Sequence, residues 1–171
     1  MNRILKVFFL CVAFFAFSGV ASAQIKIAHV NTNEVMNAMP EKTKAEKDLE
    51  NYYNELQEQL KTMYTEYQNK LQDYQANAET MSNLVKQSKE KELVDLESRI
   101  TAFQANAENE FDAKRAELLA PLLEKIQNAI NAVGKEKGFT YILDVATGTT
   151  VYIGTDATDV TKDVKSKLGI K

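Results

Sequence analysis

The amino-acid sequence predicts an α+β fold that is mainly helical, in which a long antiparallel helical hairpin projects from a small β body. Three observations support this prediction. Apolar residues recur every three or four positions across residues 49–133, the recurrence weakens once near its middle, and short β-branched segments stand near both ends. Outside the helical stretch too little apolar sequence remains for one chain to bury a core, so we expect several chains to share the body.

Residues 1–23 are typical of a secretory signal peptide. Two basic residues, Arg3 and Lys6, precede an apolar run over residues 7–17, and a small-residue cleavage site ends at Ala23. A membrane anchor is the alternative, but a bilayer-spanning helix needs about 20 apolar residues and this run is shorter. We therefore expect cleavage near Ala23.

The chain that remains after cleavage is acidic and has no cysteine. Without Arg3 and Lys6 it holds 19 basic residues against 24 acidic ones, a formal net charge of −5. Because Cys11 lies in the removed segment, the mature chain has neither a disulfide nor a cysteine for a lipid anchor. The negative charge argues against nucleic acid as a partner.

The body is predicted from residues 24–40 and 135–171. Residues 25–30 are rich in β-branched side chains and precede a turn-prone segment, so they predict one strand. Asn31 with Glu34 is typical of a capping box, which opens a short helix that a proline ends.

A β-hairpin and a last helix are predicted after the arm. Residues 139–145 and 149–153 are strand-like and flank a Thr-Gly turn. Asp156 or Thr158 is expected to cap the last helix. The apolar residues that share one face of this helix are Val160, Val164 and Leu168. Strands from several chains could then close one shared sheet or barrel without an exposed edge.

Residues 41–134 are predicted to form the hairpin arm. Steps of three and four keep an apolar stripe on each helix facing the other helix, and an eleven-residue step from Met63 to Tyr74 locally relaxes the supercoil. We call the predicted contact residues the hairpin seam: Leu49, Tyr53, Leu56, Leu60, Met63, Tyr67, Leu71, Tyr74, Leu93, Leu96, Ile100 and Phe103.

The reversal between the arm helices is expected within residues 82–88, where polar side chains interrupt the stripe although neither glycine nor proline marks a turn. The alternative is one straight helix that pairs with another chain. We favour the hairpin because the chain must return to place its last strands beside its first. At 1.5 Å per residue, a helix over residues 41–81 would extend roughly 60 Å. Pro121 is expected to kink the returning helix or to break it into two.

The sequence offers no constellation for catalysis. His29 is the only histidine and has no cysteine with which to form a metal site or a nucleophilic pair, so we expect it to pack at the body. Gly134 and Gly138 lack the Lys-Ser/Thr of a phosphate loop and are expected to end a helix. The carboxylates lie on helix faces, where pairs such as Glu66 with Lys70 are common. We predict no enzyme, no metal and no cofactor.

Four segments, taken in order with the signal peptide and the long hairpin, resemble one family. They are KIAHVN at 26–31, LAPLLEKI at 119–126, KGFTYILD at 137–144 and TDVT at 158–161. Over nearly the whole mature chain the sequence resembles the OmpH/Skp family of periplasmic chaperones. The resemblance implies a homotrimer, with a β-barrel body from three chains and three arms around a cavity. That cavity would hold unfolded outer-membrane proteins without ATP, in the periplasm of a Gram-negative bacterium. The assembly positions implied by the resemblance are Ile25, Ile27, Val30, Tyr141, Leu143, Val151 and Ile153.

The arm departs from the best-known members of that family, which carry positive arm surfaces towards membranes and lipopolysaccharide. Residues 41–134 hold 12 Lys or Arg against 18 Asp or Glu, which argues against lipopolysaccharide or membrane contact. A local basic excess remains only at the expected tip, in Lys86, Lys89 and Lys91. A solvated loop is the alternative interpretation of this cluster.

Five of the seven tyrosines lie on the first arm helix, and two of them, Tyr52 and Tyr64, lie off the seam. Exposed amphipathic rings suit weak contacts with varied unfolded chains, although ordinary arm packing is the alternative. Two functions fit the periodicity: a trimeric holdase chaperone, which we favour, and a structural or adaptor coiled-coil protein of the cell envelope that binds one folded partner.

Overall fold

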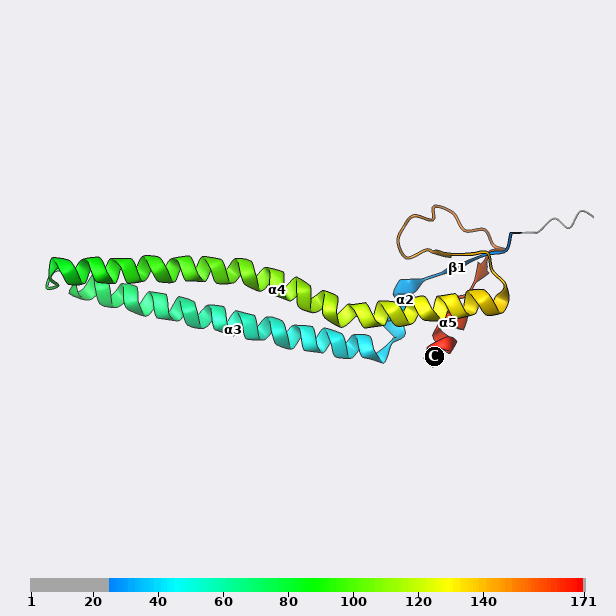
Figure 1. Cartoon of the computed structure of the whole chain (residues 1–171), viewed down its shortest axis with the longest axis horizontal. Coiled ribbons are helices and arrows are strands. Elements are labelled where there is room, and N and C mark those ends of the chain that lie inside the picture. The colour runs from blue at the N-terminus through cyan, green and yellow to red at the C-terminus, as the bar shows by residue number, and fades with distance from the viewer. Residues whose placement is uncertain (1–24, 171) are drawn as a thin grey trace, which may run out of the picture.

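The computed structural model describes residues 25–170. The elements in chain order are β1 (Ile27–Val30), α2 (Thr32–Ala38), α3 (Pro40–Asn77), α4 (Asn83–Lys137), β2 (Tyr141–Asp144), β3 (Thr158–Asp159) and α5 (Thr161–Lys167). Helices α3 and α4 lie side by side and extend away from a small body at one end (Figure 1). The mainly helical α+β fold with a projecting hairpin is thus confirmed. The predicted signal peptide, with Cys11, lies outside the described residues.

The two arm helices run antiparallel. Contacts between them join Glu41 to Lys125 near the body, Tyr64 to Gln104 midway and Lys70 to Glu92 towards the tip. A single straight helix is therefore wrong, and the paired stripes of sequence explain why the chain folds back on itself.

The turn at the tip lies about one helical turn earlier than predicted. Helix α3 ends at Asn77, and Ser82 is the N-cap of α4, where its Oγ accepts a hydrogen bond from the amide of Val85 at 3.4 Å. The prediction of residues 82–88 is wrong because Ser82 begins a helix and does not form the centre of a turn. The lysine cluster consequently lies on the first turns of α4.

Helix α4 continues without a break through Pro121. The alternative of two separate helices is therefore wrong. Figure 1 shows α4 changing direction as it passes from the arm into the body. At its other end the helix stops at Gly138, whose φ of +66° is the left-handed conformation that glycine adopts most easily. Lys26 supports this end, since its Nζ donates to the carbonyl oxygen of Lys137 at 2.7 Å.

The body contains a three-stranded parallel sheet with the order β2-β1-β3. Ile27 is in register with Tyr141, and His29 is in register with both Leu143 and Asp159. The central strand comes from the start of the described chain and the two outer strands from its end, so the arm is inserted between β1 and β2.

The predicted β-hairpin over residues 139–145 and 149–153 is wrong. Within residues 25–170, β2 pairs only with β1, and residues 149–153 form no strand. The carboxylate of Asp144 accepts hydrogen bonds from the amides of Ala146 and Thr32, at 2.9 and 3.3 Å. The first bond forms a local turn after β2, and the second ties the end of β2 to the start of α2.

The predicted N-cap of α2 is confirmed, whereas the predicted N-caps of α5 are not. The Asn31 side chain caps α2 by accepting from the amide of Glu34 at 3.0 Å, as predicted. The predicted caps of α5 are wrong, because Thr158 lies in β3 and the N-cap is Val160, which has no side-chain cap. Just before it, the carboxylate of Asp159 accepts from the amide of Thr161 at 2.8 Å.

One small core joins the sheet to three helices. Its buried members are Ala28, Val30, Val35, Met39, Leu122, Ile126, Ala129, Val133, Val160 and Val164. Helix α4 supplies four of them, so its last turns are part of the body as well as the base of the arm. Among the described helices, none combines the length and apolar composition that a membrane crossing requires.

Candidate functional site

The outer face of the sheet is apolar and uncovered. Side chains alternate along β1, so Ala28 and Val30 enter the core while Ile27 faces outwards beside Tyr141 of β2. Leu143 lies two positions further along the same face. We call the exposed apolar residues of the body the body patch: Ile25, Ile27, Tyr141, Leu143, Val151, Tyr152 and Ile153.

The body patch contains six of the seven predicted assembly residues. Their exposed fractions run from 43% for Ile153 to 97% for Val151. Val30 differs because it points to the opposite face, where it is buried in the core of its own chain. Tyr152, at 84% exposed, is an additional member that the sequence prediction did not single out. Ile27, Tyr141 and Leu143 lie on the sheet face, whereas Val151, Tyr152 and Ile153 lie in the segment between β2 and β3. A small body with this many exposed large apolar side chains is typical of one that another chain covers.

His29, on the central strand β1, makes one electrostatic contact across to β3. Its Nε2 lies 4.0 Å from a carboxylate oxygen of Asp159. Partial burial raises the pKa of Asp159, but hydrogen bonds from Thr161, with the nearby His29, outweigh it and hold the pKa below its usual value. The contact joins β1 to β3. No cluster of three His, Cys, Asp or Glu side chains that could hold a metal occurs within residues 25–170.

The hairpin seam is only partly buried. Leu56, Leu93, Leu96 and Ile100 are buried. The half-buried seam residues are Leu49, Leu60, Met63, Tyr67, Leu71, Tyr74 and Phe103. Tyr53 is 49% exposed, yet its ring packs edge-to-face on Phe111 with the centroids 5.8 Å apart. The arm is therefore a thin two-helix layer with apolar atoms near its surface.

The two off-seam tyrosines reach across to α4. The hydroxyl of Tyr52 donates to the carboxylate of Glu110 at 3.0 Å, and this bond raises the pKa of Tyr52. The hydroxyl of Tyr64 accepts from the amide nitrogen of Gln104 at 3.1 Å, although 42% of Tyr64 remains exposed. Both hydroxyl groups are thus engaged within the arm.

Charged side chains join the helices near the tip. Lys89 Nζ lies 3.0 Å from the Asp73 carboxylate, and Lys70 lies 2.5 Å from Glu92. Hydrogen bonds from these lysines lower the pKa of both carboxyl groups. Lys89 of the predicted basic cluster is therefore neutralised by its neighbour. Beside the cluster, Leu84 is 78% exposed, which the three-four pattern did not indicate.

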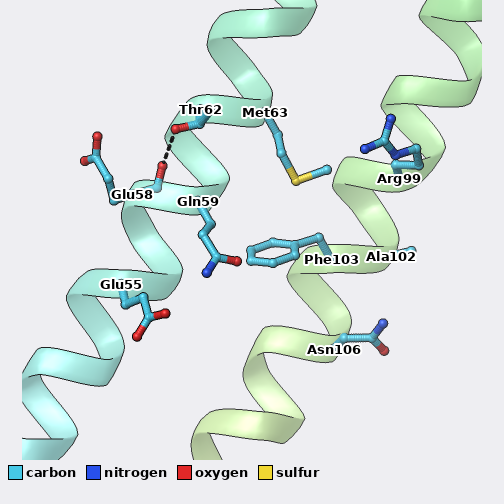
Figure 2. Close-up of a pocket in the computed structure, with 9 residues that line it drawn as sticks. All are labelled: Glu55, Glu58, Gln59, Thr62, Met63, Arg99, Ala102, Phe103 and Asn106. Atoms are coloured by element: carbon cyan, nitrogen blue, oxygen red, sulfur yellow. Dashed lines mark hydrogen bonds between the residues drawn. The ribbon is translucent and has the colours of Figure 1, made fainter.

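Midway along the arm an open groove of about 820 Å³ lies between the helices (Figure 2). We call it the arm groove and define it by Glu55, Gln59, Met63, Arg99, Ala102 and Phe103. Met63 and Phe103 point into the space between the helices, and the Gln59 amide lies beside the Phe103 ring. Glu55 lies on the α3 rim and Arg99 on the α4 rim.

A long arm, a small body and exposed apolar surfaces are typical of proteins that bind other proteins. Comparison with known proteins identifies the family. Residues 26–168 match the model of the family described as outer membrane protein (OmpH-like). The chain belongs to the OmpH-like family, which confirms the resemblance found in the sequence. The family is non-enzymatic, so the chain is not an enzyme.

Curated relatives and a solved structure agree with this assignment. The chaperone protein Skp of Photorhabdus luminescens is 30% identical over 139 residues, which cover 79% of this chain and 84% of that protein. Skp of Pectobacterium atrosepticum is 26% identical, with 93% and 97% covered. The crystal structure of an OmpH-like protein from Caulobacter crescentus superposes with a TM-score of 0.65 at 16% identity, covering 84% of this chain and 83% of that one. This last likeness bears on the fold alone.

Proposed function

We propose that the mature protein is an ATP-independent holdase chaperone of the periplasm of a Gram-negative bacterium. In this proposal the signal peptide directs export and is removed near Ala23, which leaves a soluble chain. Three copies join through the body patch, and their arms enclose a cavity. Unfolded outer-membrane protein precursors, which we call clients, are held in that cavity and kept from aggregating.

The body patch is the observation that carries the proposal. Seven large apolar side chains are exposed on a body whose own core has ten buried members. Such a surface favours association of copies, because each apolar side chain removed from water stabilises the assembly. A shared body directs the arms from one hub, which is the geometry that a cavity between them requires.

The named relatives supply the second support. The matched curated proteins are called chaperone protein Skp, and this chain covers 84% and 97% of the two cited. A holdase needs only to bind unfolded chains in preference to folded ones, since mass action then lowers the concentration of free, aggregation-prone client. The arms offer many half-buried apolar side chains for such binding and need no cofactor to do so.

The negative charge of the arm argues against anionic ligands. We infer that lipopolysaccharide and nucleic acid are not ligands, because carboxylates outnumber basic groups along the arm and Lys89 is already paired with Asp73. The clients are expected to be bound through apolar and polar contacts.

An aggregation assay tests the proposal. An outer-membrane β-barrel protein is diluted from urea into buffer with the mature protein at one trimer per client, and light scattering is followed. Suppressed scattering at this stoichiometry, without ATP, is the expected result. Unchanged scattering would contradict the chaperone function. Capture of one folded envelope protein in place of many unfolded precursors would favour the adaptor alternative.

A further inference from the structure

We propose that the arm groove is a binding site for an aromatic side chain of an extended client segment in which an acidic residue neighbours the aromatic one. This inference rests on the proposed function and deepens it by naming where a client is held and which residues it presents. The groove, and not the whole arm surface, is assigned this role.

The packing along α4 changes at the groove. Leu93, Leu96 and Ile100 are buried, whereas Phe103, the next seam residue, is only half-buried. Phe103 also borders a smaller groove of about 270 Å³. Phe103 therefore lines two open spaces, and the arm itself covers its side chain incompletely.

The interior of the groove suits an aromatic ligand. An aromatic ring gains favourable offset or edge-to-face contacts with Phe103, and the thioether of Met63 makes favourable contacts with a ring edge. A space of about 820 Å³ lies within the usual range of sites for small ligands. Because the groove is open along the arm, a segment of chain can cross it while one side chain enters.

The charged side chains on the two rims of the groove favour an acidic client residue next to the bound aromatic one. Arg99 stands on the α4 rim and forms no ion pair among the described residues, so its guanidinium is free to bind a carboxylate in a two-pronged manner. Glu55 and Glu58 stand on the opposite rim, and Lys61 lies 3.4 Å from Glu58. An acidic client residue is therefore attracted to one rim and repelled by the other, which fixes the direction of the bound segment.

The exposed Ala102 allows the groove to be filled without removing any packing. Ala102→Leu adds bulk inside the groove and keeps a good helix former. Ala113→Leu is the matched control, since Ala113 is also exposed and lies eleven residues, about three turns, along the same face of α4 but outside the groove. Circular dichroism and sedimentation of both variants check that fold and assembly are retained.

The test uses ten-residue fluorescent peptides of Gly, Ser and Thr that carry a central Phe-Asp, Ala-Asp or Phe-Lys pair. Binding to the mature, assembled protein is followed by fluorescence anisotropy. We expect the Phe-Asp peptide to bind at least about tenfold more tightly than the other two. Ala102→Leu should lose about tenfold in its affinity for that peptide, while Ala113→Leu binds as the wild type does. Arg99→Gln should remove the preference for Asp over Lys.

Equal binding of the Phe-Asp peptide by the wild type and Ala102→Leu would overturn the inference, as would equal losses in Ala102→Leu and Ala113→Leu. A wild-type protein that still suppresses client aggregation in that case leaves the proposed function standing. Failure of the wild type in the aggregation assay would count against the proposed function itself, separately from the peptide result.

Discussion

Truncation of Leu143 is expected to weaken assembly while leaving the core of each assembled chain intact. Leu143 belongs to the body patch and is 47% exposed on the outer face of the sheet. Fully burying a leucine side chain contributes about 1.5–3 kcal/mol, so covering its exposed half contributes about 1 kcal/mol per chain. Most of this contribution disappears in Leu143→Ala, while the core on the other face of the sheet is unchanged.

The effect is multiplied by the number of copies. Three chains lose about 3 kcal/mol per trimer, which lowers the association constant roughly 100-fold. Because the midpoint concentration of a trimer varies as the inverse square root of its association constant, the midpoint rises about tenfold. Sedimentation velocity over a dilution series measures it. Leu84→Ala, at the exposed arm tip, is the matched control and should leave the midpoint unchanged. An unchanged midpoint in Leu143→Ala would refute the assignment of the body patch to assembly.

Three further predictions concern stability. Val164→Ala removes a fully buried side chain from the body core and should cost about 2 kcal/mol, seen as a lower Tm, whereas Val94→Ala on the exposed arm should not. Gly138→Ala forces a side chain into a left-handed conformation at the end of α4 and should cost about 1 kcal/mol in urea unfolding; equal stability would contradict the cap. The pKa values of Asp73 and Glu92 are lowered from 3.8 and 4.5 by their lysine partners. The two ion pairs therefore stabilise the tip above these values, and this stabilisation is lost as the pH falls through the lowered pKa values of the folded protein. The protection of tip amides, taken as the observed exchange rate relative to the intrinsic rate at each pH, should weaken over that range. Protection that does not change with pH would contradict this account.

The arm was predictable because its determinants are local and repeated. Steps of three and four from Leu49 to Tyr74, and again from Leu93 to Phe103, require one neighbouring helix and allow little else. The tip was less predictable, since serine serves equally well in a turn and at an N-cap. Ser82 takes the second role, which moves the turn towards α3.

The body shows where local pattern is insufficient. Residues 149–153 have strand-forming side chains, but a strand also needs a partner, and the partner is set by contacts far away in sequence. Asp144 bonds to Thr32, 112 positions earlier, and this contact joins the end of β2 to the start of α2. No spacing of nearby residues contains that information.

The two candidate sites also differ in how far the sequence predicts them. Alternation along β1 and β2 places Ile27, Tyr141 and Leu143 on one face, so this part of the body patch follows from the sequence. The arm groove does not, because Met63 and Phe103 fit the seam pattern whether the helices pack tightly or leave space between them. Interhelical spacing depends on the side chains of both helices together.

Sedimentation equilibrium of the mature protein tests the shared body most directly. The expected result is a single species of three times the chain mass at micromolar concentration, which dissociates on dilution with loss of folded structure. A monomer that stays fully folded at the lowest measurable concentration would contradict both the shared body and the cavity between its arms.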